Sequence, residues 1–351
     1  MVKAFYQSAH YEPLREAWVR RAPIGPNITF GDTYSIERHR ILDYFDQMSV
    51  ERVGVLHGEY LLHPTGLLLS DRNLVLTAAC VSLEDTSVAD SLSSQFADPR
   101  VTTYLKGRLD EWEDLPLAVS PPLLCDPYTL NYFHFSLELI PRARHFAHVR
   151  DRPLLITKEC VAQPFQLDLL RRALSGISYH LLTRSIRVRD PIIAHDSMSE
   201  EGVYWLRRES GISVRSGKRR VYIRRGAGGT RSTSGGGISE SAEFLTLLRD
   251  FGFETIEPSG GDLGVAAQVE ALEGAGLILA AHGAALTNLA YLHPELTVIE
   301  VMGPKTAWGC FMHLAAMLGF RYHGMLSRTY DDDGNIIVDL DELRGALSAR
   351  I

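Results

Sequence analysis

The stretch LILAAHGAALTN at residues 277–288 carries the strongest signal for the fold. It begins with an almost continuous apolar run, which is typical of strands buried on both faces of a parallel sheet. His282 and Gly283 follow at once, and the chain then enters a predicted helix over residues 284–292, which ends before Pro294. A buried strand that turns directly into a helix indicates a β-α unit of an open α/β sheet.

The same alternation continues on both sides of this stretch. Apolar runs predict further strands at residues 221–223, 254–256 and 297–301, separated by amphipathic helices, the first of which Ser239 is expected to cap. This β-α-β-α-β-α-β series predicts a Rossmann-like domain over residues 196–330. A turn and a helix are expected to follow in residues 331–351.

The first half of the chain is less regular. Apolar runs predict strands at residues 154–157 and 179–182, a spacing close to the helical period predicts a helix within 131–150, and turn residues at 71–73 predict a hairpin. The first forty residues resemble an arm or an edge element. We therefore expect an α/β domain over residues 1–195, and the polar composition that follows marks a domain boundary.

Charge and cysteine content exclude some classes of function. The 351 residues carry a formal charge of -7, with a sequence pI of about 6.0, so the chain lacks the overall basic character by which proteins neutralise nucleic-acid phosphates. The four cysteines are scattered and show no metal-ligand spacing. Neither a nucleic-acid partner nor a metal site is predicted.

The N-terminus has no continuous apolar region like that of a signal peptide. The long uncharged stretch at residues 274–294 contains His282, Asn288 and His293, which fit a membrane span poorly. We expect a cytoplasmic protein with no transmembrane segment, for which peripheral contact with a membrane stays open.

Arginines follow the predicted strand at residues 221–223. Arg224 and Arg225 come first, and a glycine-, serine- and threonine-rich loop then carries Arg231. Such a loop can bring backbone N–H groups to an anion while a guanidinium binds two of its oxygens. The alternative is a surface loop flanked by solvated arginines. Phosphate binding is the interpretation that we favour.

The ends of two other strands carry polar residues as well. A diphosphate fits the helix N-terminus at Gly283 and Ala284, where His282 could donate a hydrogen bond to a phosphate oxygen. Glu300 interrupts an apolar run, and a buried carboxylate needs a partner, such as the two hydroxyls of a ribose. Alternatives are a structural histidine and a carboxylate that is exposed or paired with an arginine.

A histidine and a glutamate in the first half are spaced one helical turn apart. His134 and Glu138 can share one face of the predicted helix, and an imidazole oriented by a carboxylate is a suitable general base for a hydroxyl group. A core histidine is the alternative, and these residues alone do not decide between the two.

Five segments together resemble a known family: NYFHFSLELIPR (131–142), VYIRR (221–225), Gln268-Val269, HGAALTN (282–288) and VIEV (298–301). Their order and spacing resemble glycosyltransferase family 61. The chain departs from the family pattern at Ala285, where glycine is usual, at Ser239-Glu240, where an asparagine-glutamate pair is usual, and in the glycine-rich insertion around Gly235.

This resemblance implies a GT-B-like α/β fold in which two Rossmann-like domains face a cleft. It also implies an inverting transfer that needs neither a metal nor a cofactor. The expected donor is a nucleoside-diphosphate sugar, with UDP as the expected nucleotide, and the acceptor is a hydroxyl of a glycan, a glycolipid or another molecule. His134 and Glu138 would then be catalytic. The donor-binding residues would be Arg224, Arg225, Arg231, His282, Gly283, Ala284, Asn288 and Glu300.

Two alternatives from other classes deserve comparison. A nucleotide-sugar-binding protein without transferase activity would keep the donor residues but would not need His134 and Glu138. A dinucleotide-dependent oxidoreductase would place a glycine-rich turn after its strand, whereas Gly274-Ala275-Gly276 precedes it. We also interpret Asp331-Asp332-Asp333, followed by Gly334, as a turn and not as a metal-binding motif.

Overall fold

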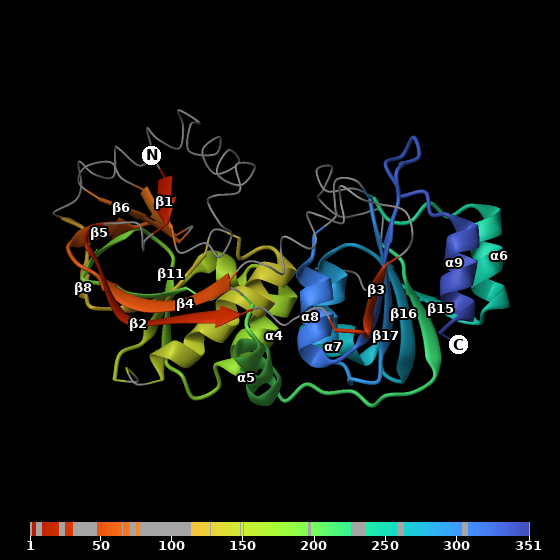
Figure 1. Ribbon diagram of the computed structural model, residues 1–351. Coiled ribbons are helices and arrows are strands. Elements are labelled where there is room, and N and C mark those ends of the chain that lie inside the picture. The colour runs from red at the N-terminus through yellow and green to blue at the C-terminus, as the bar shows by residue number, and fades with distance from the viewer. Residues whose placement is uncertain are drawn as a thin grey trace. The chain divides into compact units, whose positions relative to one another are not determined.

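The computed structural model describes residues 2–4, 9–20, 25–30, 48–64, 66–70, 75–77, 114–126, 128–147, 149, 151–195, 198–225, 236–257, 263–303 and 308–350. The chain divides into two compact units, and both are discontinuous. The first contains Met1–Val19 and Ser49–Ser210, and the second contains Arg20–Met48 and Gly211–Ile351. The α/β class expected from the sequence is confirmed in both units (Figure 1).

The second unit is built on six parallel strands. In spatial order they are β15 (Phe253–Ile256), β14 (Arg219–Ile223), β16 (Ala275–Ala281), β17 (Thr297–Met302), β18 (Arg321–Leu326) and β3 (Ile28–Phe30). The first five follow the doubly wound order 2-1-3-4-5, which places the topological switch point between β14 and β16. The sixth strand comes from the N-terminal part of the chain.

Helices cover both faces of this sheet (Figure 1). The helices α6 (Ala242–Asp250) and α9 (Leu340–Ser348) lie on one face, and α7 (Val265–Glu270) and α8 (Cys310–Leu318) lie on the other. Side chains of α6 and α9 pack on alternate residues of the strands, including Tyr222, Leu279 and Val301. The opposite face of the strands, which carries Glu300, meets the other helical layer.

One local prediction in this unit was wrong. Ser241 caps α6, because its Oγ accepts a hydrogen bond of 3.1 Å from the Phe244 N–H, whereas the backbone N–H of Ser239 pairs with Ile336 O. The predicted helix after β16 is confirmed, and it is the 3₁₀-helix η6 (Ala284–Tyr291), which is wound more tightly than an α-helix.

The first unit contains two six-stranded sheets. One has the order β11 (Tyr179–Leu182), β10 (Leu154–Thr157), β9 (Pro122–Leu124), β13 (Ile192–His195), β4 (Met48–Leu56) and β2 (Tyr11–Arg20). Its four strands from β11 to β13 are parallel, and β4 is antiparallel to β13. The predicted strands at 154–157 and 179–182 are confirmed.

The second of these sheets was not predicted as a sheet. Its order is β1 (Val2–Ala4), β7 (Val75–Thr77), β6 (Leu67–Leu69), β5 (Glu59–Leu62), β12 (Ile186–Arg189) and β8 (Leu117–Val119). The antiparallel pairing of β6 with β7 confirms the predicted hairpin. Because this sheet accompanies the parallel one, the first unit is more than a single doubly wound sheet.

Sharp corners join the two sheets of the first unit. Strand β8 continues into β9 through Ser120 and Pro121, and β12 continues into β13 through Asp190 and Pro191. Ser120 and Asp190 both have φ of 48°, in the left-handed region that L-residues seldom adopt. The corners therefore carry backbone strain at two equivalent positions.

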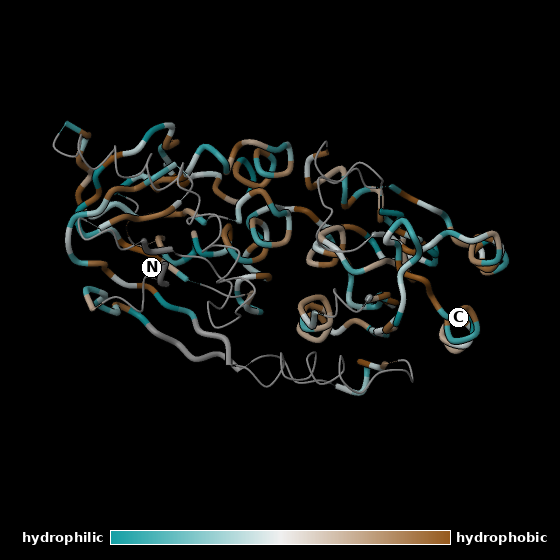
Figure 2. The backbone as a smooth tube through the Cα atoms, turned by 90° about the horizontal axis from the view of Figure 1, so that it is seen from above, coloured by the Kyte–Doolittle hydropathy of each residue, from teal (hydrophilic) through white to brown (hydrophobic). Residues whose placement is uncertain are grey.

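The predicted boundary after residue 195 lies one helix before the division between the units. Helix α5 (Glu200–Ser210) follows that boundary but packs on α4 (Pro164–Ala173) and on η4 (Ile140–Phe146) in the first unit. Its polar surface resembled a linker in the sequence, while Val203 and Leu206 on its inner face are buried. Figure 2 shows hydrophobic stretches in the interior of both units.

Candidate active site

The carboxyl ends of β14 and β16 bring predicted donor residues together at the switch point of the second sheet. Strand β14 leads into Arg224 and Arg225, and the neighbouring β16 leads into His282 and Gly283. Arg225 Nη1 donates to His282 O over 3.3 Å and to Gly236 O over 3.5 Å. The guanidinium thus lies directly beside the turn at which open α/β sheets bind their ligands.

His282 is held by a carboxylate from the next strand. Its Nδ1 lies 2.5 Å from Glu300 Oε1, and the other oxygen of Glu300 accepts a hydrogen bond from the hydroxyl of Tyr322. Burial, together with the charge of Glu300, raises the pKa of Tyr322 well above its usual value, so this hydroxyl stays protonated and donates. The side chain of Glu300 is fully buried, whereas the side chain of His282 is 13% exposed.

This geometry changes the expected role of Glu300. Both of its oxygens already have partners within the chain, so the arrangement does not support direct contact with a ribose. Instead, the carboxylate accepts the Nδ1 hydrogen of His282 and leaves Nε2 as the nitrogen that can meet a ligand. The ring of Phe311 packs beside the imidazole of His282, with 5.3 Å between the ring centroids, and limits the rotation of the imidazole from one side.

Arg224 and Arg225 differ in their surroundings, although they are adjacent. Arg224 donates from Nε to Glu240 Oε1 over 2.7 Å and from Nη1 to Glu257 Oε1 over 3.0 Å. These bonds raise the pKa of Arg224 and commit its Nε and Nη1 to carboxylates within the chain. Of the two, Arg225 is therefore the better placed to meet an anion.

The remaining predicted donor residues fall into three groups. Gly283 and Ala284 are partly exposed at the start of η6, so their backbone N–H groups lie where a diphosphate was expected. Asn288 is fully buried and donates to Ala285 O over 3.0 Å and to Gln268 Oε1 over 3.5 Å, which ties η6 to α7 instead of facing a ligand. Arg231 lies outside the described residues.

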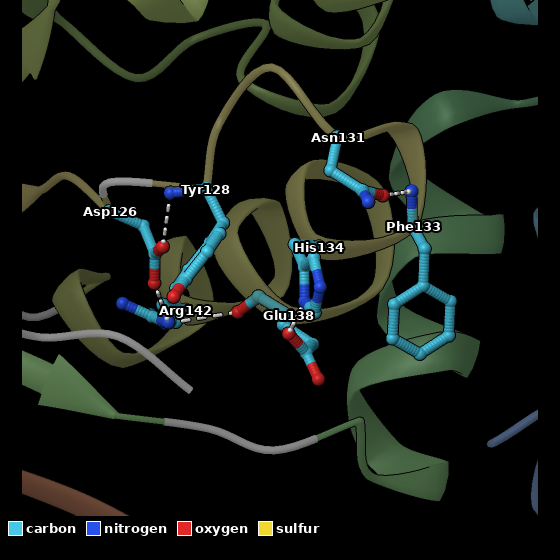
Figure 3. A network of polar contacts seen from close by, with 7 residues as sticks. All are labelled: Asp126, Tyr128, Asn131, Phe133, His134, Glu138 and Arg142. Carbon is cyan, nitrogen blue, oxygen red and sulfur yellow. Dashed lines mark hydrogen bonds and ion pairs between the residues drawn. The ribbon is translucent and has the colours of Figure 1, made fainter. Parts of the chain in front are cut away.

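His134 and Glu138 meet as predicted, in the first unit. His134 Nδ1 and Glu138 Oε2 are 2.6 Å apart, on the helix η3 (His134–Leu139), which begins after the carboxyl end of β9 (Figure 3). This helix is a π-helix, in which the N–H of Ile140 donates to Phe135 O. Short π-helical turns are rare and often occur at functional sites.

The environment of His134 suits a proton acceptor. Burial lowers the pKa of His134, but the charge and the hydrogen bond of Glu138 outweigh this effect, and the pKa lies above its ordinary value. The imidazole is 25% exposed and lies between the rings of Tyr128 and Phe133, with centroid distances of 5.4 and 5.3 Å. Its orientation is therefore set by Glu138 and by two aromatic neighbours.

Sequence reasoning missed the polar residues behind both histidines. Asp126 and Arg142 form a fully buried ion pair of 2.8 Å beneath His134, and Tyr322 completes the surroundings of Glu300. Asp126 directly follows the apolar run PLLC at residues 122–125, which was an available signal. Nothing in the sequence pairs Tyr322 with Glu300, because the two residues belong to neighbouring strands that only the fold brings together.

Two further findings bear on the predictions. Asp331 accepts hydrogen bonds from the backbone N–H groups of Asp333 and Asn335, over 3.0 and 2.7 Å, as expected of a turn. Across the described ranges, no three histidine, cysteine or acidic side chains are grouped so as to hold a metal ion. In the same part of the chain, every helix is too short or too polar to cross a membrane.

Comparison with known proteins agrees with the resemblance seen in the sequence. The model of the family described as Glycosyltransferase 61 matches residues 132–299. This match begins two residues before the π-helix of the first unit and ends in β17. It includes His134, Glu138 and His282 and stops one residue short of Glu300. No curated protein gives a significant match to the chain. By this match, residues 132–299 form a glycosyltransferase family 61 domain.

Proposed function

We propose that this glycosyltransferase moves a sugar from a nucleoside-diphosphate donor, with UDP as the expected nucleotide, to a hydroxyl of a glycan, a glycolipid or another acceptor. The transfer inverts the anomeric configuration and needs no metal. The observation that carries the proposal is the placement of His282, which the buried Glu300 orients at the switch point beside Arg225. Sheets of this strand order bind phosphorylated ligands there.

The donor diphosphate would lie against Arg225, His282 and the N–H groups of Gly283 and Ala284. During transfer, the bond between the anomeric carbon and the diphosphate oxygen breaks, and its electron pair leaves with the diphosphate. Fixed donors stabilise this developing charge, and each well-placed one contributes on the order of 10²-fold in rate. A guanidinium and an imidazole then fill the role that a metal ion has in other glycosyltransferases.

His134 is the proposed general base for the acceptor. The acceptor oxygen attacks the anomeric carbon while its proton passes to Nε2 of His134, because Nδ1 is already engaged by Glu138. A single displacement of this kind inverts the configuration at the carbon. The His134–Glu138 pair also favours a transferase over a protein that only binds nucleotide sugars, since a binding protein has no need of a base.

Calorimetry with UDP, GDP, CMP and NAD in the presence of EDTA tests the proposal. It would be carried out on the wild type, on His282→Ala and on His293→Ala, which removes an exposed histidine from the same unit. We expect one nucleoside diphosphate to bind, with an affinity that only His282→Ala weakens. Binding of none of the four, or of NAD alone, would refute the donor site.

The stereochemistry of the transfer and its independence of metal ions need a separate assay. With the sugar nucleotide whose nucleotide binds best, slow hydrolysis in EDTA should release a free sugar of inverted configuration, which NMR can identify from the anomeric coupling before mutarotation. Retention of configuration, or a strict requirement for a divalent cation, would contradict the proposed mechanism.

A further inference from the structure

Asp126 is hydrogen bonded to two residues near His134, Tyr128 and Arg142. Its Oδ1 accepts a hydrogen bond of 2.8 Å from the backbone N–H of Tyr128, whose ring packs against the imidazole. Its Oδ2 accepts one of 2.8 Å from Nη2 of Arg142. Figure 3 shows Asp126 between these two residues. The carboxylate of Asp126 thus holds the chain at Tyr128, before the π-helix, and the side chain of Arg142, after the π-helix.

Arg142 connects this carboxylate to Glu138. Its Nε donates to the backbone oxygen of Glu138 over 3.0 Å, so a single guanidinium binds the side chain of Asp126 and the main chain that carries Glu138. Glu138 in turn holds His134 Nδ1 at 2.6 Å. The contacts therefore run without a gap from Asp126 through Arg142 and Glu138 to His134.

The ion pair is an expensive element of the fold. The side chains of Arg142 and Asp126 are 1% and 3% exposed, and the desolvation of two such charges is seldom repaid in stability by their attraction. A pair of this kind needs a further reason, such as the fixing of one conformation among several. The adjacent π-helix is a conformation that needs such support, because its hydrogen-bonding pattern is rarely stable by itself.

We propose that Asp126 and Arg142 are positioning residues for the His134–Glu138 pair, and that they maintain the π-turn in which the carboxylate of Glu138 meets the imidazole. This inference rests on the proposed function only where it concerns catalysis. The positioning itself is a property of the protein without substrate, and it can be measured as such.

Arg142→Lys separates geometry from charge. The positive charge of Arg142 lowers the pKa of His134, and lysine keeps that charge, but a single ammonium lacks the fork that binds Asp126 and the Glu138 carbonyl together. If Arg142 acts by position, Glu138 moves away and the pKa of His134 falls toward 6.5. NMR titration of the histidine ring resonances measures this shift, and Glu138→Gln provides the reference for complete loss of the carboxylate.

Arg144→Lys is the matched control. Arg144 lies on η4, the 3₁₀-helix that also carries Arg142, and its side chain is 7% exposed. It pairs with the buried Glu51 over 2.5 Å and with Ser199 over 3.2 Å. The same substitution there disturbs a second buried ion pair without touching the Asp126–Arg142 pair. It should lower the melting temperature and leave the pKa of His134 at the wild-type value.

An unchanged pKa of His134 in folded Arg142→Lys would overturn the proposal, as would an equal fall in both lysine variants. If Arg142→Lys does not fold, Asp126→Glu retains both charges while it displaces the guanidinium, and it should produce the same fall. Transfer assays then address catalysis separately. If the pKa of His134 falls in Arg142→Lys but kcat is unchanged, the proposal that Arg142 positions Glu138 stands, and the assignment of His134 as the general base is refuted.

Discussion

Glu300 and His282 are hydrogen bonded across two neighbouring parallel strands, with 2.5 Å between Oε1 and Nδ1. The carboxylate is fully buried and the imidazole reaches the carboxyl end of the sheet. A glutamate that looks from the sequence like a ligand for ribose is therefore a support for a histidine. The same relationship occurs in the first unit between Glu138 and His134, so each unit presents an imidazole whose ring a glutamate orients.

The supporting role of Glu300 predicts that its loss acts on the diphosphate and not on the ribose. Glu300→Gln should weaken binding of the nucleoside diphosphate about tenfold, or about 1.4 kcal/mol, because the orientation of His282 is lost. Calorimetry with the ribonucleotide and its 2′-deoxy analogue, on wild type and variant, forms a thermodynamic cycle. We expect the two penalties to add. A substantial coupling energy would instead show that Glu300 contacts the ribose.

The two adjacent arginines should respond differently to substitution. Arg225→Gln removes the guanidinium beside His282 and should weaken nucleotide binding by about 1.5–3 kcal/mol, the range for hydrogen bonds to charged groups. Arg224→Gln breaks contacts with Glu240 and Glu257 and should mainly affect stability. Affinity and urea midpoint, measured on both variants, check this contrast. A greater loss of affinity in Arg224→Gln would reverse the assignment.

The rate of transfer should depend on pH through His134. A general base must be unprotonated, and the pKa of His134 is raised, so kcat/KM should fall on the acidic side with a midpoint above 6.5. In Glu138→Gln this midpoint should move to lower pH, because the carboxylate that raises the pKa is gone, while the maximal rate drops. An acidic midpoint that does not move would argue against His134 as the titrating base.

Stability should follow the same titration with a definite sign. Because the pKa of His134 is higher in the folded protein, its pair with Glu138 stabilises the fold fully below the unfolded value near 6.5, and this contribution is lost as the pH rises through the folded pKa. The difference in free energy of unfolding between wild type and Glu138→Gln should therefore narrow from pH 6 to pH 9. A constant difference would mean that the pair does not titrate as inferred.

The strained corners of the first unit give a test that is independent of catalysis. Ser120→Gly should stabilise the protein by about 0.5–1 kcal/mol, since glycine adopts a φ of 48° without the steric cost that serine bears. Ser175→Gly is the control, because Ser175 is exposed and has no positive φ. There the substitution should be neutral or destabilising. Equal effects at both positions would show that the corner stores no strain.

The parts of this fold that sequence predicts are those fixed by local pattern. Continuous apolar runs such as LLIT at Leu154–Thr157 locate strands well, because burial on both faces leaves no other place for them. The His134–Glu138 pair was also predictable, since four residues of helix bring two side chains onto one face. Both features depend on neighbours in the sequence.

The rest depends on partners that are distant in the sequence. The second sheet of the first unit pairs β12 with β5, more than a hundred residues apart, and no local pattern encodes such a register. The role of Glu300 depends on Tyr322 from the next strand, and the π-helix depends on Arg142 and Asp126. Ser239 and Ser241 are two equally suitable caps that lie two residues apart, and the pairing of Ser239 with Ile336 decides between them.

The sixth strand of the second sheet also imposes an order of events on the growing chain. Among the described strands, β3 pairs with β18 alone, through Ile28 with Tyr322, Thr29 with His323 and Phe30 with Gly324. Thr29 in β3 and Tyr322 in β18 are 293 residues apart, so β3 is synthesised long before the strand with which it pairs. We therefore expect the second unit to complete its fold only after β18 has been synthesised, and a fragment beginning at Gly211 to expose the bare edge of β18 to aggregation.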